Sequence, residues 1–146
     1  MSTKSNSCWY LTRVINLDES FAFFLNNQNH TISVGRREST NDFVCIGPHV
    51  SRNHLQLIRT DPCSRGRIKW SLLDLGGIVG TFVNLIKVKP FIPFPLSCGD
   101  LIGVGSPESS SIREAGKETF VFKIHSPMEQ EEIDPELEEM VFGASN

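Results

Sequence analysis

The fold is predicted from residues 35–58, GRRESTNDFVCIGPHVSRNHLQLI, in which polar clusters alternate with short apolar runs. Phe43–Ile46 and Leu55–Ile58 are short and rich in strand-forming residues, so we expect two neighbouring strands there. The polar residues at positions 35–36 and 51–54 then fall in the loops beside these strands. Binding sites are usually carried by such loops on a rigid scaffold.

Three side chains in these loops suit an anion with several oxygens. Arg36 offers a planar fork of donors that matches phosphate, Ser51 a hydroxyl that both donates and accepts, and Arg52 a second cation. The tetrapeptide Ser51–His54 taken alone fits a polar β-turn with a locally satisfied histidine equally well. The order of further motifs along the chain decides between these two interpretations.

Four landmarks follow one another along the chain: Thr31–Arg36, Ser51–His54, Asp74 with Gly80–Asn84, and Leu96–Ile102. Together they closely resemble the forkhead-associated (FHA) domain over about residues 8–125. The resemblance implies an all-β fold, an antiparallel β-sandwich of about 10–11 strands with ligand loops at one end. It also implies a module that binds phosphothreonine-containing proteins or peptides, without catalysis and without a cofactor.

The resemblance assigns roles to individual residues. Arg36 and Ser51 bind the phosphate, Arg52 assists, and the third loop lies beside the peptide. His54 is mainly architectural, because it ties the recognition loops together. The predicted peptide-binding residues are Arg36, Ser51, Arg52, Gly77, Ile78 and Val79, and the predicted structural supports are Gly35, His54, Gly80 and Thr81.

The third loop departs from the family pattern at Val79. If Gly80-Thr81 is the Gly-Thr pair of the family, Val79 stands where an asparagine normally holds the peptide backbone, and Gly77 stands where a hydroxyl residue is usual. Valine cannot make that hydrogen bond, so either the peptide is held differently or its affinity is reduced. The alternative is an FHA-like dimerisation module, a homodimer with weakened or lost phosphate recognition.

Length and charge divide the chain into three parts. We expect a disordered leader at residues 1–7, one domain at residues 8–125 and an acidic tail at residues 126–146. All 14 Lys and Arg precede residue 126, but only 10 of the 17 Asp and Glu do, so the first part carries 14 − 10 = +4. This charge suits an anionic ligand, but it is too small and too scattered for a direct nucleic-acid surface.

The strands at the two ends of the domain follow from apolar runs between turn signals. Cys8–Leu17, Ser20–Leu25 and the strand ending at Gly35 are predicted to be consecutive antiparallel strands, with a turn at Asp18-Glu19. Residues 106–117 form a long polar insertion, and Thr119–Ile124 is the closing strand.

Other functional classes lack the sequence patterns that they require. The four cysteines form no Cys-x-x-Cys pair and the four histidines show no metal-ligand spacing, so we expect buried thiols at Cys8 and Cys45 and no metal site. The Gly-rich stretch at residues 75–81 leads into a strand, whereas a nucleotide loop leads into a helix. A small serine hydrolase using Ser51 and His54 is a remote alternative, because no partner carboxylate or oxyanion donor is identified.

The expected location is intracellular, without a membrane partner. No apolar run approaches the roughly 20 residues that span a bilayer, and the first residues do not resemble a signal peptide. The layout resembles the FHA modules of checkpoint kinases, DNA-damage mediator proteins and RING-type ubiquitin ligases, which implies nuclear or nucleo-cytoplasmic DNA-damage and checkpoint signalling. Neither a kinase signature set nor a zinc-ligand array is present, so a stand-alone adaptor and a terminal module of a larger protein both fit.

Overall fold

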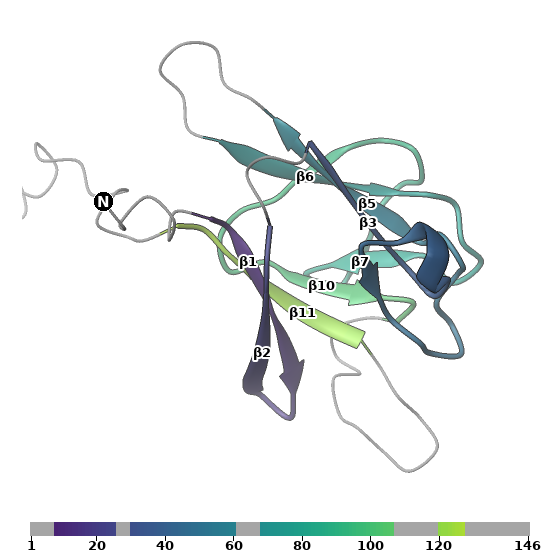
Figure 1. The fold of residues 1–146 in the computed structure, drawn as a ribbon, viewed down its shortest axis with the longest axis horizontal. Coiled ribbons are helices and arrows are strands. Elements are labelled where there is room, and N and C mark those ends of the chain that lie inside the picture. Colours follow the sequence, from purple (N-terminus) through teal and green to yellow (C-terminus); the bar gives the residue numbers. More distant parts are fainter. Residues whose placement is uncertain (1–7, 26–29, 61–67, 107–119, 128–146) are drawn as a thin grey trace, which may run out of the picture.

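The computed structural model describes residues 8–25, 30–60, 68–106 and 120–127 as two β-sheets packed into a sandwich (Figure 1). One sheet has six strands, in the order β2 (Asp18–Phe24), β1 (Tyr10–Ile15), β11 (Phe120–His125), β10 (Leu101–Val104), β7 (Thr81–Val83) and β8 (Ile86–Lys87). The other has five, in the order β4 (Phe43–Val44), β3 (Thr31–Gly35), β5 (Leu55–Thr60), β6 (Lys69–Asp74) and β9 (Phe94–Pro95). A short 3-10 helix, η2 (Glu38–Thr40), precedes β4.

The predicted β-sandwich is confirmed, with one difference in strand direction. Among the described residues every strand pair is antiparallel except β3 with β4, where Val34 lies opposite Phe43 in a parallel pairing. β4 has only two residues. After β3 ends, the chain turns back through η2, so β4 starts beside the end of β3 and runs in the same direction.

The core lies between the two sheets and follows from the alternation of residues along the strands. In β5 Leu55 and Leu57 are buried, and in β6 Trp70 and Leu72 are fully buried while their neighbours are not. Side chains two positions apart in a strand point to the same face, so this pattern sets one face of the sheet against the core. The buried apolar side chains supply the main stabilisation of the sandwich.

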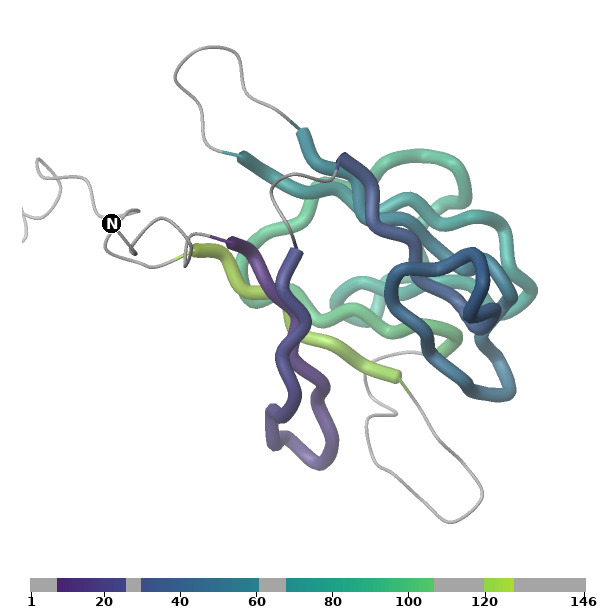
Figure 2. The backbone as a smooth tube through the Cα atoms, viewed as in Figure 1, coloured from purple at the N-terminus to yellow at the C-terminus, as the bar shows by residue number. Residues whose placement is uncertain are grey.

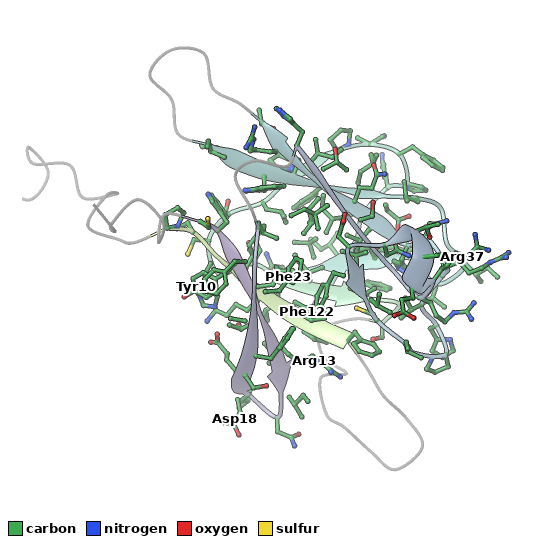
Figure 3. All side chains as sticks on the ribbon, in the orientation of Figure 1. Tyr10, Arg13, Asp18, Phe23, Arg37 and Phe122 are labelled. Atoms are coloured by element: carbon green, nitrogen blue, oxygen red, sulfur yellow. The ribbon has the colours of Figure 1, made fainter. Side chains whose placement is uncertain are left out.

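Aromatic contacts join the two sheets at the side where β2 and β4 are the edge strands. The Phe43 ring stacks on Phe23 with 4.5 Å between centroids and meets Phe122 edge-on at 5.1 Å. Phe23 and Phe122 are labelled in Figure 3; they belong to β2 and β11 of the same sheet, with β1 between them. Stacked and edge-on rings add stability beyond the apolar area that they bury.

The third strand differs from the prediction of three consecutive antiparallel strands. β1 and β2 pair as expected, with Leu11 opposite Phe23. β3, however, belongs to the other sheet, where Val34 pairs with Leu55 of β5. The physical reason is burial, because Ile32 and Val34 are buried against the core whereas β2 is almost wholly exposed.

The first hairpin turns two residues earlier than predicted. Asp18 and Glu19 belong to β2, where they pair with Ile15 and Val14. Asn16 and Leu17 form the turn, with φ values of 53° and 72°. Positive φ at both central residues defines the type I′ turn that suits the twist of a hairpin. Asparagine is usual in such a turn but leucine is not, so Asn16-Leu17 does not match the common two-residue turn sequences.

Several predictions fall outside the described residues or are only partly covered by them. The leader at residues 1–7, most of the insertion and the tail beyond residue 127 lie outside the described ranges, as does Thr119. Of the predicted buried thiols, Cys45 is buried and Cys8 is half-buried. Burial raises the pKa of the Cys45 thiol to about 12, so this group is neutral at physiological pH. None of the helical turns in the described parts is long and apolar enough to cross a membrane.

The loops that were predicted to recognise a ligand meet at one end of the sandwich, on the right in Figure 2. Backbone bonds join them directly: the Arg36 N–H donates to the Ser51 carbonyl at 2.9 Å, and the Leu75 N–H donates to the His54 carbonyl at 3.0 Å. The β3–β4, β4–β5 and β6–β7 connections therefore form one continuous surface.

Candidate functional site

The first two loops are held together by backbone hydrogen bonds. Besides the bond from Arg36 to Ser51, the Arg37 N–H donates to the Arg52 carbonyl at 3.1 Å. Gly35 permits this approach, since a Cβ atom there would collide with the Arg52 carbonyl oxygen. The Asn41 side-chain amide then donates to the carbonyls of Arg37 at 2.7 Å and Arg52 at 2.6 Å. The arginine-bearing segments are thus fixed against each other.

His54 connects the serine loop to the third loop from a fully buried position. Its Nδ1 accepts a hydrogen bond from the Ser51 N–H at 3.0 Å, and its Nε2 lies 2.8 Å from the Gly80 carbonyl oxygen, which can only accept. The ring is therefore neutral, with its proton on Nε2. Burial lowers the pKa of His54, while the bond to Gly80 and the negative charge of Asp74 act in the opposite direction. The structure places His54 in an architectural position.

The third loop is anchored by a buried carboxylate. Asp74 accepts a hydrogen bond from the Thr81 hydroxyl at 2.6 Å and another from the Gly76 N–H at 3.1 Å. Asp74 and Thr81 are both buried, so these bonds are protected from water and satisfy the groups that make them. Between them lies Gly80, whose φ of +93° is rarely adopted by other residues. The bond from Thr81 therefore ties the end of the third loop, next to Gly80, to Asp74 at its beginning.

This arrangement contradicts the serine hydrolase alternative. Both ring nitrogens of His54 are engaged, one by the Ser51 backbone and one by Gly80, so neither is available to take a proton from the Ser51 hydroxyl. The carboxylate of Asp74 bonds to Thr81 and Gly76 and not to the imidazole. The geometry of a catalytic triad is absent from these three residues.

Two adjoining hollows open between the loops. The larger, of about 580 Å³, is lined by Arg37, Ser51, Arg52, Asn53, Leu75, Gly76, Gly77 and Ile78. The smaller, of about 220 Å³, is lined by Arg36, Pro48, His49, Val50, Ser51, Ile78 and Val79. Ser51 and Ile78 belong to both and form the wall between them. All six residues predicted to contact a peptide line one hollow or the other.

The arginine side chains at this end are exposed and positioned to receive an anion. The Nε of Arg36 donates to the Val50 carbonyl at 3.0 Å, which orients the guanidinium and leaves its two terminal nitrogens unbonded within the described residues. Arg37 and Arg52 also point to solvent. Figure 3 shows the Arg37 side chain extending outward from this end of the sandwich. A planar guanidinium with free terminal N–H groups is well matched to phosphate oxygens.

The third loop presents an apolar tip beside these arginines. Ile78 is 96% exposed and Val79 is half-buried at the edge of the smaller hollow. Gly77 lies so close to Ser51 that a Cβ atom there would collide with the serine Oγ. The loop thus approaches Ser51 directly, and the Val79 side chain offers no hydrogen bond at the position where an asparagine was expected.

Three polar residues of the site were not included in the sequence prediction: Arg37, Asn41 and Asn53. Arg37 and Asn53 line the larger hollow, and Asn41 bonds to both arginine-bearing loops. Arg37 directly follows Arg36 in the sequence, and this could have identified Arg37 as a residue of the site. Among the described residues, no three His, Cys, Asp or Glu side chains gather closely enough to hold a metal ion.

The fold and this site define a β-sandwich with an arginine-rich loop surface at one end. The sequence model of the FHA domain matches residues 32–105, which is half of the 146-residue chain. The chain therefore belongs to the FHA domain family, whose members are binding modules and not enzymes. No curated protein matches the chain.

Solved structures with the same fold include two of the MEK1 FHA domain. The first is 13% identical, with a TM-score of 0.66, and the comparison covers 82% of this chain and 90% of that chain. The second, solved in complex with a phosphothreonine peptide of HOP1, is 14% identical, with a TM-score of 0.62 and coverage of 82% and 97%. The FHA domain of an Arabidopsis thaliana hypothetical protein is 22% identical, with a TM-score of 0.63 and coverage of 84% and 88%.

Proposed function

We propose that this chain binds phosphothreonine-containing proteins or peptides through its loop end and so mediates phosphorylation-dependent protein–protein interaction. The observation that carries the proposal is the meeting of Arg36, Ser51 and Arg52 around the two hollows, on loops locked together by His54. The phosphothreonine complex of the MEK1 FHA domain, which is similar in fold, supports the same ligand class.

The site is organised before the ligand arrives. A phosphothreonine carries a charge of about −1.5 to −2 and three strong acceptor oxygens. Arg36 is already oriented by its bond to Val50, and Ser51 by the bond between its backbone and His54. Because these donors are held in place, binding loses little free energy to ordering them. Charge-assisted bonds to phosphate are roughly twice as strong as neutral ones, so an unphosphorylated peptide should bind very weakly.

The proposal is tested by calorimetric titration with a phosphothreonine peptide and its unphosphorylated twin. Arg36→Ala and Ser51→Ala should each abolish detectable binding in a folded protein. Lys69→Ala is the control, because Lys69 is an exposed cation at the opposite end of β6 from the loops. Equal binding of the two peptides, or unchanged affinity in folded Arg36→Ala, would contradict the proposal.

The dimerisation alternative rests on the exposed Ile78 beside Val79. A fully exposed isoleucine at a loop tip is an apolar contact available to a second copy of the chain. Light scattering on the wild type and on Ile78→Ser separates the two functions. A dimeric mass that falls to the monomer in Ile78→Ser, without phosphopeptide binding by either protein, would favour dimerisation.

The proposal extends to nuclear or nucleo-cytoplasmic signalling in the DNA-damage and checkpoint response. Its support is the resemblance of the landmark order, and of the closing strand followed by Ser126-Pro127 and acidic residues, to the FHA modules of checkpoint kinases. Imaging of a tagged protein before and after DNA damage tests this context. A wild-type protein that redistributes to damaged nuclei, beside an Arg36→Ala protein that does not, is the expected result. Exclusion of the wild type from the nucleus in both conditions would overturn it.

A further inference from the structure

The linings of the two hollows carry more positive charge than one phosphothreonine neutralises. Arg37 and Arg52 line the larger hollow and Arg36 lines the smaller. In the part of the chain that the structure describes, ion pairs involve Glu19 and not these arginines. Three guanidinium groups carry +3, whereas a phosphothreonine carries about −1.5 to −2. About one positive charge or slightly more is left over once the phosphate is bound.

Hydrogen bonds to the backbone hold the segments that carry Arg37 and Arg52 side by side. Arg37 and Arg52 are joined by the bond from the Arg37 N–H to the Arg52 carbonyl, and Asn41 bonds to both carbonyls. Two arginines are thereby placed on adjacent loops beside one hollow. Like charges brought together without a counter-ion destabilise the free protein. Such a local cost is typical of a functional site that awaits a ligand of the opposite charge.

The Asn53 side chain, which also lines the larger hollow, offers further donors. The Oδ1 of Asn53 accepts a hydrogen bond from the Thr40 hydroxyl at 2.7 Å, so its carbonyl is engaged and its amide N–H groups are left to donate. None of the residues that line this hollow is acidic. A hollow whose polar lining consists of two arginines, an asparagine amide and a serine hydroxyl suits a negatively charged group.

We infer that the phosphothreonine ligand carries a second anionic group close to the phosphothreonine, and that Arg37 binds this group in the larger hollow. The inference rests on the proposed function and adds a specificity to it. Arg36 and Ser51 serve the phosphothreonine, whereas Arg37 selects ligands with a neighbouring carboxylate or second phosphate. Both chemistries offer the oxygens that a guanidinium fork recognises.

The test uses peptides with one phosphothreonine and otherwise neutral residues, in which glutamate or phosphoserine replaces each flanking position in turn. Calorimetry at moderate salt should show a roughly five- to tenfold gain in affinity at one flanking position with the wild type. Arg37→Gln should remove the gain, so that the variant binds the charged and the neutral phosphothreonine peptides with affinities within about twofold of each other. Lys69→Gln removes one positive charge at the far end of β6, and this variant should still show the gain in affinity. The larger of the glutamate and phosphoserine gains identifies the source of the anion.

The outcomes separate this inference from the proposed function. If the neutral phosphothreonine peptide binds but no second anion adds affinity, or if the gain persists in Arg37→Gln, the role of Arg37 is wrong and phosphothreonine binding stands. If folded wild type binds none of the peptides, both are wrong. A charge reversal provides a second variant: Arg37→Glu should prefer lysine over glutamate at the selected position, and an unchanged preference for glutamate would overturn the inference.

Discussion

At the scale of the residue, His54 controls how the loops are arranged. Its two ring nitrogens bond to the backbones of Ser51 and Gly80, which belong to different loops. Because the ring is fully buried, water cannot replace either bond if the side chain is lost. The position of Ser51 beside the third loop therefore depends on a side chain that is not exposed at the surface.

His54→Ala should lower the free energy of unfolding by about 2–4 kcal/mol, because it leaves a cavity and two unsatisfied backbone groups. Urea denaturation of both proteins measures this difference. His49→Ala is a suitable control for stability, since His49 is exposed. If the midpoint of unfolding did not move in His54→Ala, the architectural role would be wrong.

His54 also predicts how stability depends on pH. Burial lowers the pKa of its imidazole below the ordinary value of 6.5. Below that value the unfolded chain takes up a proton that the native ring does not, so stability is full above pH 6.5 and falls as the pH drops toward the native pKa. The slope approaches about 1.4 kcal/mol per pH unit. Urea denaturation across this pH window should show the slope in the wild type and no such slope in His54→Ala. An equal slope in both proteins would mean that groups other than His54 cause it.

Val79→Asn should increase affinity for phosphothreonine peptides roughly two- to tenfold, because it adds one hydrogen bond to the peptide backbone. Val79 lines the smaller hollow with Arg36 and Ser51, so an amide there can reach a bound peptide. Calorimetry measures the affinity and light scattering the mass, with unphosphorylated peptide as the control. An affinity that does not rise, at constant mass, would mean that the loop does not approach the peptide.

The residues whose chemistry is visible in the sequence could be predicted, and those whose role depends on backbone geometry could not. Arg36 and Ser51 are identified by side-chain type and by their order along the chain, and the structure brings them together. Asn41 and Asn53 act through bonds to Arg52 and Thr40. These bonds exist only because the two loops pair, and short-range patterns do not specify that pairing.

At the scale of the element, strand positions followed from apolar alternation, but sheet membership did not. Period-two patterns indicate which residues face the core and leave open which neighbour a strand pairs with. β3 was therefore assigned beside β2, although it pairs with β5. The hairpin turns were missed for a different reason. Asn16-Leu17 and Asn84-Leu85 both have positive φ at two consecutive residues, and leucine gives no signal of this conformation.

Leu17→Gly should stabilise the domain by about 0.5–1 kcal/mol. A left-handed backbone costs leucine about 1–2 kcal/mol, and glycine removes this cost. Part of the gain is offset because glycine loses more conformational entropy on folding. Leu17 is 91% exposed, so little apolar burial is lost. Thermal unfolding measures the change. Leu17→Ala is the matched control, since alanine also removes the side chain but keeps the strain. Equal stability of the two variants would contradict the strained turn.

At the scale of the whole molecule, the sandwich brings distant parts of the chain to one end. The β3–β4, β4–β5 and β6–β7 loops meet there, and residues 1–125 carry 14 − 10 = +4 in formal charge. The core of the sandwich fixes the loops, and the loops present the arginines to solvent. We therefore expect ligand binding at the loop end, while the rest of the sandwich holds the loops in place.

The most direct test of this assignment is an NMR titration of the isotope-labelled protein with a phosphothreonine peptide. Backbone shifts should change in the loops around Arg36, Ser51 and Val79 and remain unchanged in the strand residues at the opposite end, such as Lys69. The unphosphorylated peptide should produce no comparable change. Shifts located away from these loops, or shifts of equal size with both peptides, would contradict phosphate-dependent recognition at the loop end.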